Sequence, residues 1–223
     1  MHESPEQVAD QLRQKIWRER HQIWGDQVPA DPVDMLDPRI AIQLLGYEFE
    51  LVPEILGWPP DKHHALAGEV DPGRKQVTVS EQFGFQSARF TAAHELAHVM
   101  LHSGRMFRER PISGPRLGEQ NPAEREADKF AADFLMPKKL LLTRIRTSFD
   151  VEPPIVVRDA EAFWLDMDQP EDLLRASPNS HELAFALAKC PRDFHGNRIL
   201  SLAEQFKVSV QAMAYRVQEL RLI

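Results

Sequence analysis

The stretch Arg89-Phe-Thr-Ala-Ala-His-Glu-Leu-Ala-His-Val-Met-Leu101 decides the fold, because it joins a helical pattern to the residue spacing of a metal site. On an α-helix, His94 and His98 project from one face about one turn apart, so one divalent ion can bind both imidazoles. Glu95 lies about 100° round the helix from His94, where its carboxylate can hold a water beside that ion. The pattern therefore predicts a metal site with a general base next to it.

Such a short motif also occurs by chance, as a pair of exposed histidines on a helix. The residues on both sides argue against this interpretation, because they continue a half-apolar helical pattern, and Ser103-Gly104 offers a stop. We expect a helix that is buried on one side, with Ser87 as its N-cap.

A catalytic metal site of this class needs a third protein ligand and one open position. Residues 121–132 supply candidates, because Pro122 suits a first helical turn and an apolar face follows it. Glu124 and Asp128 share one face of this helix, whereas Glu126 points roughly 200° away from Glu124. We predict Glu124 as the ligand and Asp128 as the acceptor of a ligand histidine's N–H, with Glu126 as the alternative ligand. For either Glu124 or Asp128 taken alone, a solvated charged face is the competing interpretation.

Two segments resemble the ImmA/IrrE family of metallopeptidases. They are Arg-Phe-Thr-Ala-Ala-His-Glu-Leu-Ala-His-Val-Met-Leu-His at 89–102 and Glu-Arg-Glu-Ala-Asp-Lys-Phe-Ala-Ala-Asp-Phe-Leu-Met-Pro at 124–137. The family pattern matches position by position at His94, Glu95, His98 and the Glu124–Asp128 stretch, and the second segment is the more family-specific one. The resemblance implies a zinc-type endopeptidase, sometimes manganese-dependent. It also implies a substrate, a helix-turn-helix repressor whose cleavage switches on stress-response or mobile-element genes.

The composition is that of an ordinary soluble globular protein, with 43% hydrophobic and 27% charged residues in a chain of 223. No stretch approaches the roughly 20 apolar residues of a membrane helix, and the N-terminus has no basic-then-apolar signal pattern. The single cysteine, Cys190, excludes an internal disulfide and is expected to be buried. We therefore expect a cytoplasmic protein without a membrane segment.

The net charge of −7 gives the chain no general attraction for phosphate backbones, which disfavours direct nucleic-acid binding. An acidic surface is compatible with a basic protein substrate, such as a DNA-binding repressor. The sequence carries no signal for the oligomeric state.

The predicted fold class is α+β, a mostly helical zincin-like metallopeptidase core with a small antiparallel sheet and a helical, helix-turn-helix-like C-terminal region. We divide the chain into an N-terminal helix (1–28), the metallopeptidase core (29–145) and the C-terminal region (146–223). Besides the two motif helices, helices are expected over 5–24, within 32–45 and over 138–145, and strands over 47–52, 65–70 and 76–80.

Two segments have no clear period. Residues 104–121 are rich in Gly, Pro and Arg and are predicted to form a loop between the two motif helices. Its arginines are expected to be solvated, or else to meet an acidic partner: Arg105, Arg108, Arg110 and Arg116. Residues 149–178 are acidic and contain prolines, and no element is predicted there.

The C-terminal stretch 199–220 resembles a helix-turn-helix with a turn at 207–209 and Ser209 as the N-cap of its second helix. The second helix offers few residues to read DNA, namely Gln211, Arg216 and Gln218, with Lys207 in the turn. We therefore favour packing on the protein core or substrate docking over DNA reading.

Taken together, the residues and the family resemblance predict a Zn²⁺-dependent endopeptidase in which His94, His98 and Glu124 bind the ion and Glu95 acts as general base. The resemblance also allows Mn²⁺ as the ion. The alternative is a non-catalytic metal-binding regulatory protein, or a DNA-binding protein that uses the C-terminal helices. Glu95 argues against a purely structural metal site, which has no need of a base, and a single cysteine argues against a closed four-ligand zinc site.

Overall fold

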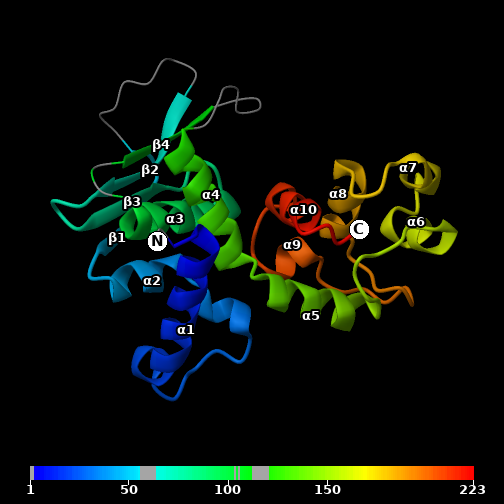
Figure 1. Cartoon of the computed structure of the whole chain (residues 1–223), viewed down its shortest axis with the longest axis horizontal. Helices are drawn as coiled ribbons and strands as arrows, with labels where there is room; N and C mark the ends of the chain where they lie inside the picture. The colour runs from blue at the N-terminus through cyan, green and yellow to red at the C-terminus, as the bar shows by residue number, and fades with distance from the viewer. Residues whose placement is uncertain (1–2, 56–63, 103, 105, 112–120) are drawn as a thin grey trace. The chain divides into compact units, whose positions relative to one another are not determined.

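The computed structural model describes residues 3–55, 64–102, 104, 106–111 and 121–223. The chain forms two compact units, unit 1 (Met1–Leu135) and unit 2 (Met136–Ile223) (Figure 1). The predicted α+β class is confirmed, with ten helices and a four-stranded sheet among the described residues. None of the helices in this described part combines the length and the apolar composition that a membrane crossing requires.

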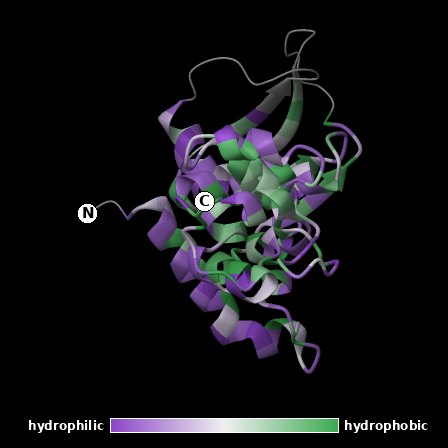
Figure 2. Cartoon of the chain, turned by 90° about the vertical axis from the view of Figure 1, so that its right-hand side faces the viewer, coloured by the Kyte–Doolittle hydropathy of each residue, from purple (hydrophilic) through white to green (hydrophobic). Residues whose placement is uncertain are grey.

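Unit 1 begins with helix α1 (Pro5–Trp24), as predicted. Ser4 and Gln7 form a capping box, in which each side chain accepts the other residue's backbone N–H. The buried face of α1 repeats at helical spacing through Val8, Leu12 and Ile16. In Figure 2 the helix that follows the N-terminus is accordingly purple with separate green bands. A 3-10 helix η1 (Pro32–Met35) and helix α2 (Pro38–Leu44) follow.

The sheet contains β1 (Glu48–Val52), β2 (His64–Asp71), β3 (Gln76–Ser80) and β4 (Met106–Pro111), in the order β1-β3-β2-β4. The β2–β3 hairpin and the β2–β4 pair are antiparallel, but β1 pairs with β3 in parallel. The prediction of an antiparallel sheet is therefore wrong for β1. The physical reason is that β4 and β3 occupy the two sides of β2, so β1 can join the sheet only beside β3. The hairpin reverses the chain between β2 and β3, and this reversal leaves β3 parallel to β1.

Strand β4 lies in the segment that we predicted to be a loop, so that prediction is wrong for Met106–Pro111. Its sequence, Met-Phe-Arg-Glu-Arg-Pro, has three charged residues in a row and no apolar alternation. Main-chain pairing with β2 stabilises it instead, and this pairing is a long-range interaction that leaves no local signature.

Helix α3 (Phe85–Leu101) packs against the sheet and against helix α4 (Pro122–Leu135). Buried residues fill α3 from Thr91 to His98, which is the pattern of a helix enclosed on several sides. Its N-cap is Gly84, with φ 81°, and not the predicted Ser87. Helix α4 begins after Asn121, whose side-chain oxygen accepts the N–H of Ala123.

Unit 2 contains six helices in its described residues: α5 (Lys138–Phe149), α6 (Asp159–Leu165), α7 (Pro170–Arg175), α8 (His181–Lys189), α9 (Leu202–Gln205) and α10 (Val210–Glu219). The predicted helix over 138–145 is confirmed and continues to Phe149. Helices α6 and α7 occupy the segment in which no element was predicted. Helices α8 and α10 pack on each other, and Cys190 is buried as expected.

The predicted helix-turn-helix corresponds to α9 and α10, and Ser209 caps α10 as predicted by accepting the N–H of Ala212. The first helix is only four residues long. Arg216 is 2% exposed, and its guanidinium donates to the Met136 carbonyl (Nε–O, 3.1 Å) and to Glu219 (Nη1–Oε2, 2.6 Å). Arg216 is thus part of the core of unit 2 and is not available to read DNA.

We expect Arg216→Ala to lower the free energy of unfolding by about 2 kcal/mol, because it leaves the Met136 carbonyl and the Glu219 carboxylate without their charged donor. Urea unfolding followed by circular dichroism measures this change. Arg175→Ala is the matched control, because Arg175 forms an exposed ion pair with Asp172 and its loss should leave the transition unchanged. Equal transitions for wild type and Arg216→Ala would contradict the prediction.

Candidate metal centre

Helix α3 presents His94 and His98 on one buried face, and their ring Nε2 atoms are 3.0 Å apart. Glu124 from α4 reaches both rings, with Oε2 at 3.3 Å from Nε2 of His94 and Oε1 at 3.3 Å from Nε2 of His98. One ligand atom from each of the three residues lies within 4.8 Å of the other two. The structure therefore brings together the three residues predicted as metal ligands.

The donor set fits a divalent cation. Zinc ligands at about 2.0–2.1 Å in a tetrahedral arrangement are separated by about 3.3 Å. The two imidazole Nε2 atoms are 3.0 Å apart, and each lies 3.3 Å from a different carboxylate oxygen of Glu124. Two imidazoles and one carboxylate form the donor set of catalytic zinc sites that keep a fourth position for water. His94, His98 and Glu124 can hold such an ion without a fourth protein ligand.

Asp128 accepts a hydrogen bond from His94, with 2.8 Å between Oδ1 and Nδ1. This contact places the ring proton on Nδ1 and leaves the Nε2 lone pair directed toward His98 and Glu124. Burial, with the positive charge of Arg108 adding to it, lowers the pKa of His94. His94 is therefore held as a neutral imidazole, which is the form that binds metals.

Glu124 and Asp128 are both held in the ionised form. Burial raises the pKa of each, but the contacts of Glu124 with the two histidines and the hydrogen bond that Asp128 accepts from His94 outweigh it, and both pKa values fall well below the usual range. For Asp128 the charge of Arg108 acts in the same direction. Two ionised carboxylates beside two imidazoles make a site that favours a positive ion.

Glu95 is fully buried, and neither of its carboxyl oxygens has a hydrogen-bond partner among the described residues. Burial raises the pKa of Glu95 to about 8, although the charge of Arg108 opposes the shift. A cation held by His94 and His98 would lower this pKa again, because it favours the carboxylate. A carboxyl whose pKa responds to a bound ion in this way can both accept and return a proton.

Gly68 on β2 allows the sheet to approach Glu95. A Cβ atom at this position would overlap Glu95 Oε1 and would lie 2.7 Å from Cγ2 of Thr91. The pairing of β2 with β4 shifts register between Leu66 and Gly68, which marks an irregularity at the same place. Sequence reasoning missed this residue, although an isolated glycine within a strand is a recognised sign of close backbone approach.

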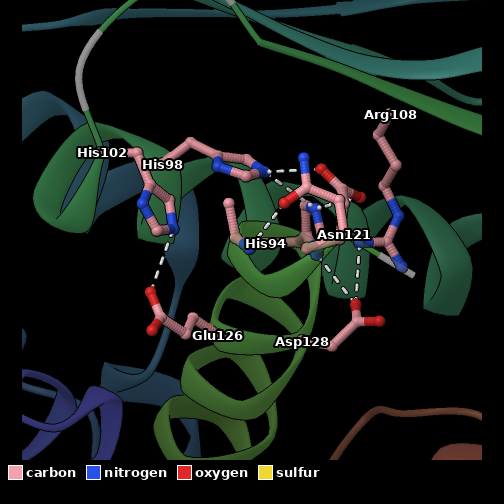
Figure 3. A network of polar contacts seen from close by, with 9 residues as sticks. His94, His98, His102, Arg108, Asn121, Glu126 and Asp128 are labelled. Atoms are coloured by element: carbon pink, nitrogen blue, oxygen red, sulfur yellow. Dashed lines mark hydrogen bonds and ion pairs between the residues drawn. The ribbon is translucent and has the colours of Figure 1, made fainter. Parts of the chain in front are cut away.

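Arg108 on β4 was also missed. It is 4% exposed, and its Nη1 lies 2.9 Å from Asp128 Oδ1, while its Cζ atom lies 5.7 Å from the centre of the Phe90 ring. Figure 3 shows Arg108 and Asp128 meeting beside His94. The expectation of a solvated side chain is wrong for Arg108; Arg105 and Arg116, and the side chain of Arg110, lie outside the described residues.

Glu126, the alternative third ligand, lies outside the cluster. Its side chain is 55% exposed, and its Oε2 is 3.8 Å from Nε2 of His102, the C-cap residue that follows α3 (Figure 3). His102 is two turns along the helix from His94 and contributes no atom to the group of His94, His98 and Glu124.

A helix-borne pair of histidines, completed by a carboxylate from a second helix and accompanied by a buried glutamate, is the kind of site found in metallopeptidases. Residues 56–164 match the peptidase family model described as the IrrE N-terminal-like domain. The matched region belongs to the ImmA/IrrE family and contains His94, Glu95, His98, Glu124 and Asp128. No curated protein matches the chain.

Proposed function

We propose that this protein is a metal-dependent endopeptidase that hydrolyses a peptide bond in a regulatory protein. The observation that carries the proposal is the meeting of Glu124 with both imidazole Nε2 atoms, 3.3 Å from each, next to the buried carboxyl of Glu95. Membership of a peptidase family supports the same reaction class.

In this proposal His94, His98 and Glu124 hold Zn²⁺, or alternatively Mn²⁺. The ion, when bound, polarises the scissile carbonyl and lowers the pKa of a water molecule. Glu95 takes a proton from the attacking water and passes it to the leaving amine, a role that suits a buried carboxyl next to a metal ligand. Asp128 keeps the Nδ1 proton of His94 in place, so that Nε2 stays available as a ligand.

The substrate is proposed to be a helix-turn-helix repressor, and the resemblance to the family supports this assignment. The net charge of −7 favours association with a basic DNA-binding protein. Strand β4 is at the edge of the four-stranded sheet and carries Arg108, so its main chain passes beside the site. An extended peptide can pair with a strand in this position. The proposed location is the cytoplasm, where such repressors act.

The test is cleavage of a purified repressor encoded next to the gene for this protein, with fragments identified by mass spectrometry. We expect cleavage with Zn²⁺ or Mn²⁺, none after treatment with a chelator, and recovery when the metal is returned. Metal at a hundredfold excess over its Kd should also stabilise the fold by about 2.7 kcal/mol, measured as a rise in Tm.

The matched control is His98→Ala, which removes one imidazole of the cluster and should abolish both the rise in Tm and the cleavage. Cleavage that is unaffected by the chelator would overturn the metal-dependent mechanism. Metal binding without cleavage of any candidate repressor would instead favour a non-catalytic regulatory protein.

A further inference from the structure

The arrangement of Arg108 within unit 1 is not explained by the roles given to the proposed metal ligands. Arg108 comes from the edge strand β4, whereas His94 belongs to α3 and Asp128 to α4. Its guanidinium is enclosed, with the side chain 4% exposed. A buried arginine is costly unless it is paired, so its position near Asp128 calls for a specific role.

A single oxygen atom joins the three elements. Oδ1 of Asp128 accepts from Nδ1 of His94 at 2.8 Å and from Nη1 of Arg108 at 2.9 Å. Both distances are those of strong, charge-assisted hydrogen bonds. The planar guanidinium also lies near the Phe90 ring of α3, which restricts its orientation. Arg108 thus limits the positions that the Asp128 carboxylate can adopt.

We infer that Arg108 is a positioning residue for the metal centre: it fixes Asp128 against His94 and thereby directs Nε2 of His94 toward His98 and Glu124. This inference rests on the proposed metal site. Arg108 itself contributes no ligand atom to the cluster of His94, His98 and Glu124, and its hydrogen bond to the site goes to Asp128. Partners that orient metal-binding histidines typically change metal affinity by 10–100-fold when they are lost.

The experiment uses the full chain and makes two measurements. Competition with a chromophoric chelator gives the Zn²⁺ affinity, and the visible absorption spectrum of the Co²⁺-loaded protein reports on the geometry of the site. We expect Arg108→Gln to weaken Zn²⁺ binding by about 10–100-fold and to change the Co²⁺ spectrum. Arg108→Lys keeps the charge but not the planar geometry, and should recover part of the affinity. Thermal unfolding in excess chelator reports separately on folding.

A double variant tests the route through Asp128. If Arg108 acts only through Asp128, then Arg108→Gln combined with Asp128→Ala should bind Zn²⁺ no more weakly than Asp128→Ala alone. The matched control is Arg89→Gln, because Arg89 is a part-buried arginine of α3 whose Nη2 donates to the Leu36 carbonyl at 2.7 Å. Its loss should alter stability but leave both the Zn²⁺ affinity and the Co²⁺ spectrum as in the wild type.

The outcomes separate this inference from the proposed function. Wild-type affinity and an unchanged spectrum in Arg108→Gln would overturn the positioning role and leave the metallopeptidase proposal intact. Fully additive losses in the double variant would also overturn it, because they would show that Arg108 acts independently of Asp128. A wild-type chain that binds neither Zn²⁺ nor Co²⁺ would overturn the proposed function and this inference together.

Discussion

Replacing Glu95 with glutamine should lower kcat/KM for repressor cleavage by about 10²–10⁴-fold, while the protein still binds Zn²⁺. The amide has nearly the same size and shape as the carboxyl but cannot accept the proton of the attacking water. Glu95 contributes no atom to the cluster of His94, His98 and Glu124, so metal affinity should change little. Cleavage is measured from the initial rate of fragment formation, and metal content by elemental analysis.

The fold should also tolerate this change. Neither carboxyl oxygen of Glu95 has a hydrogen-bond partner among the described residues, so glutamine removes a buried acid without breaking such a bond. The unfolding midpoint of Glu95→Gln should therefore not fall below that of the wild type. Loss of activity would then report on the reaction and not on misfolding.

Glu126→Gln is the matched control, because it makes the same chemical change on α4 at a side chain that lies outside the cluster. We expect it to cleave at the wild-type rate. A Glu95→Gln protein that cleaves as fast as the wild type would show that the general base is another residue. A strong loss of cleavage activity in Glu126→Gln would instead support Glu126 as the third metal ligand.

Replacing Gly68 with alanine should have an effect of comparable size on activity, although Gly68 contributes no functional group. The added Cβ would overlap Oε1 of Glu95 and press against the methyl group of Thr91. Either β2 must move away from α3 or the Glu95 carboxyl must leave its position. We expect cleavage to fall by about 10²-fold or more, as for misplacement of a catalytic group, and the free energy of unfolding to fall by about 1–3 kcal/mol.

Gly73→Ala is the control for this change, because its Cβ would meet only Asp71 Oδ1, at 3.3 Å, in the exposed β2–β3 turn. It should retain activity and stability. A second variant asks whether the clash involves Glu95 itself: the stability cost of Gly68→Ala should shrink when Glu95 is already alanine. An unchanged cost in that background, or full activity of Gly68→Ala, would contradict the proposed close approach.

The elements that the sequence predicted well are those with a local pattern. Helix α1 is defined by its Ser4 capping box and its apolar spacing, and β3 by strict alternation around Val77 and Val79. The placement of Glu124 near His94 could also be anticipated, because helical phase separates it from Glu126.

Other features depend on partners that are distant in the sequence, and no local pattern reveals them. The parallel pairing of β1 follows from the position of β4 on the opposite side of β2. The burial of Arg108 follows from Asp128, twenty residues away on another element. A charged strand such as β4 looks like a loop when only its own residues are considered, and Arg216 looks like a surface residue until the Met136 carbonyl is placed beside it.

The hydrogen bond between Arg216 and Met136 joins positions 80 residues apart, at the two ends of unit 2. A second bond, from the Ile155 N–H to the Leu222 carbonyl, fastens the same terminal stretch to the connection before α6. These two hydrogen bonds connect the C-terminal stretch of unit 2 to the first residue of the unit and to the segment before α6. Deleting α10 would therefore remove the hydrogen bond that holds the start of the unit as well as the packing at its end, so the last helix stabilises both ends of unit 2.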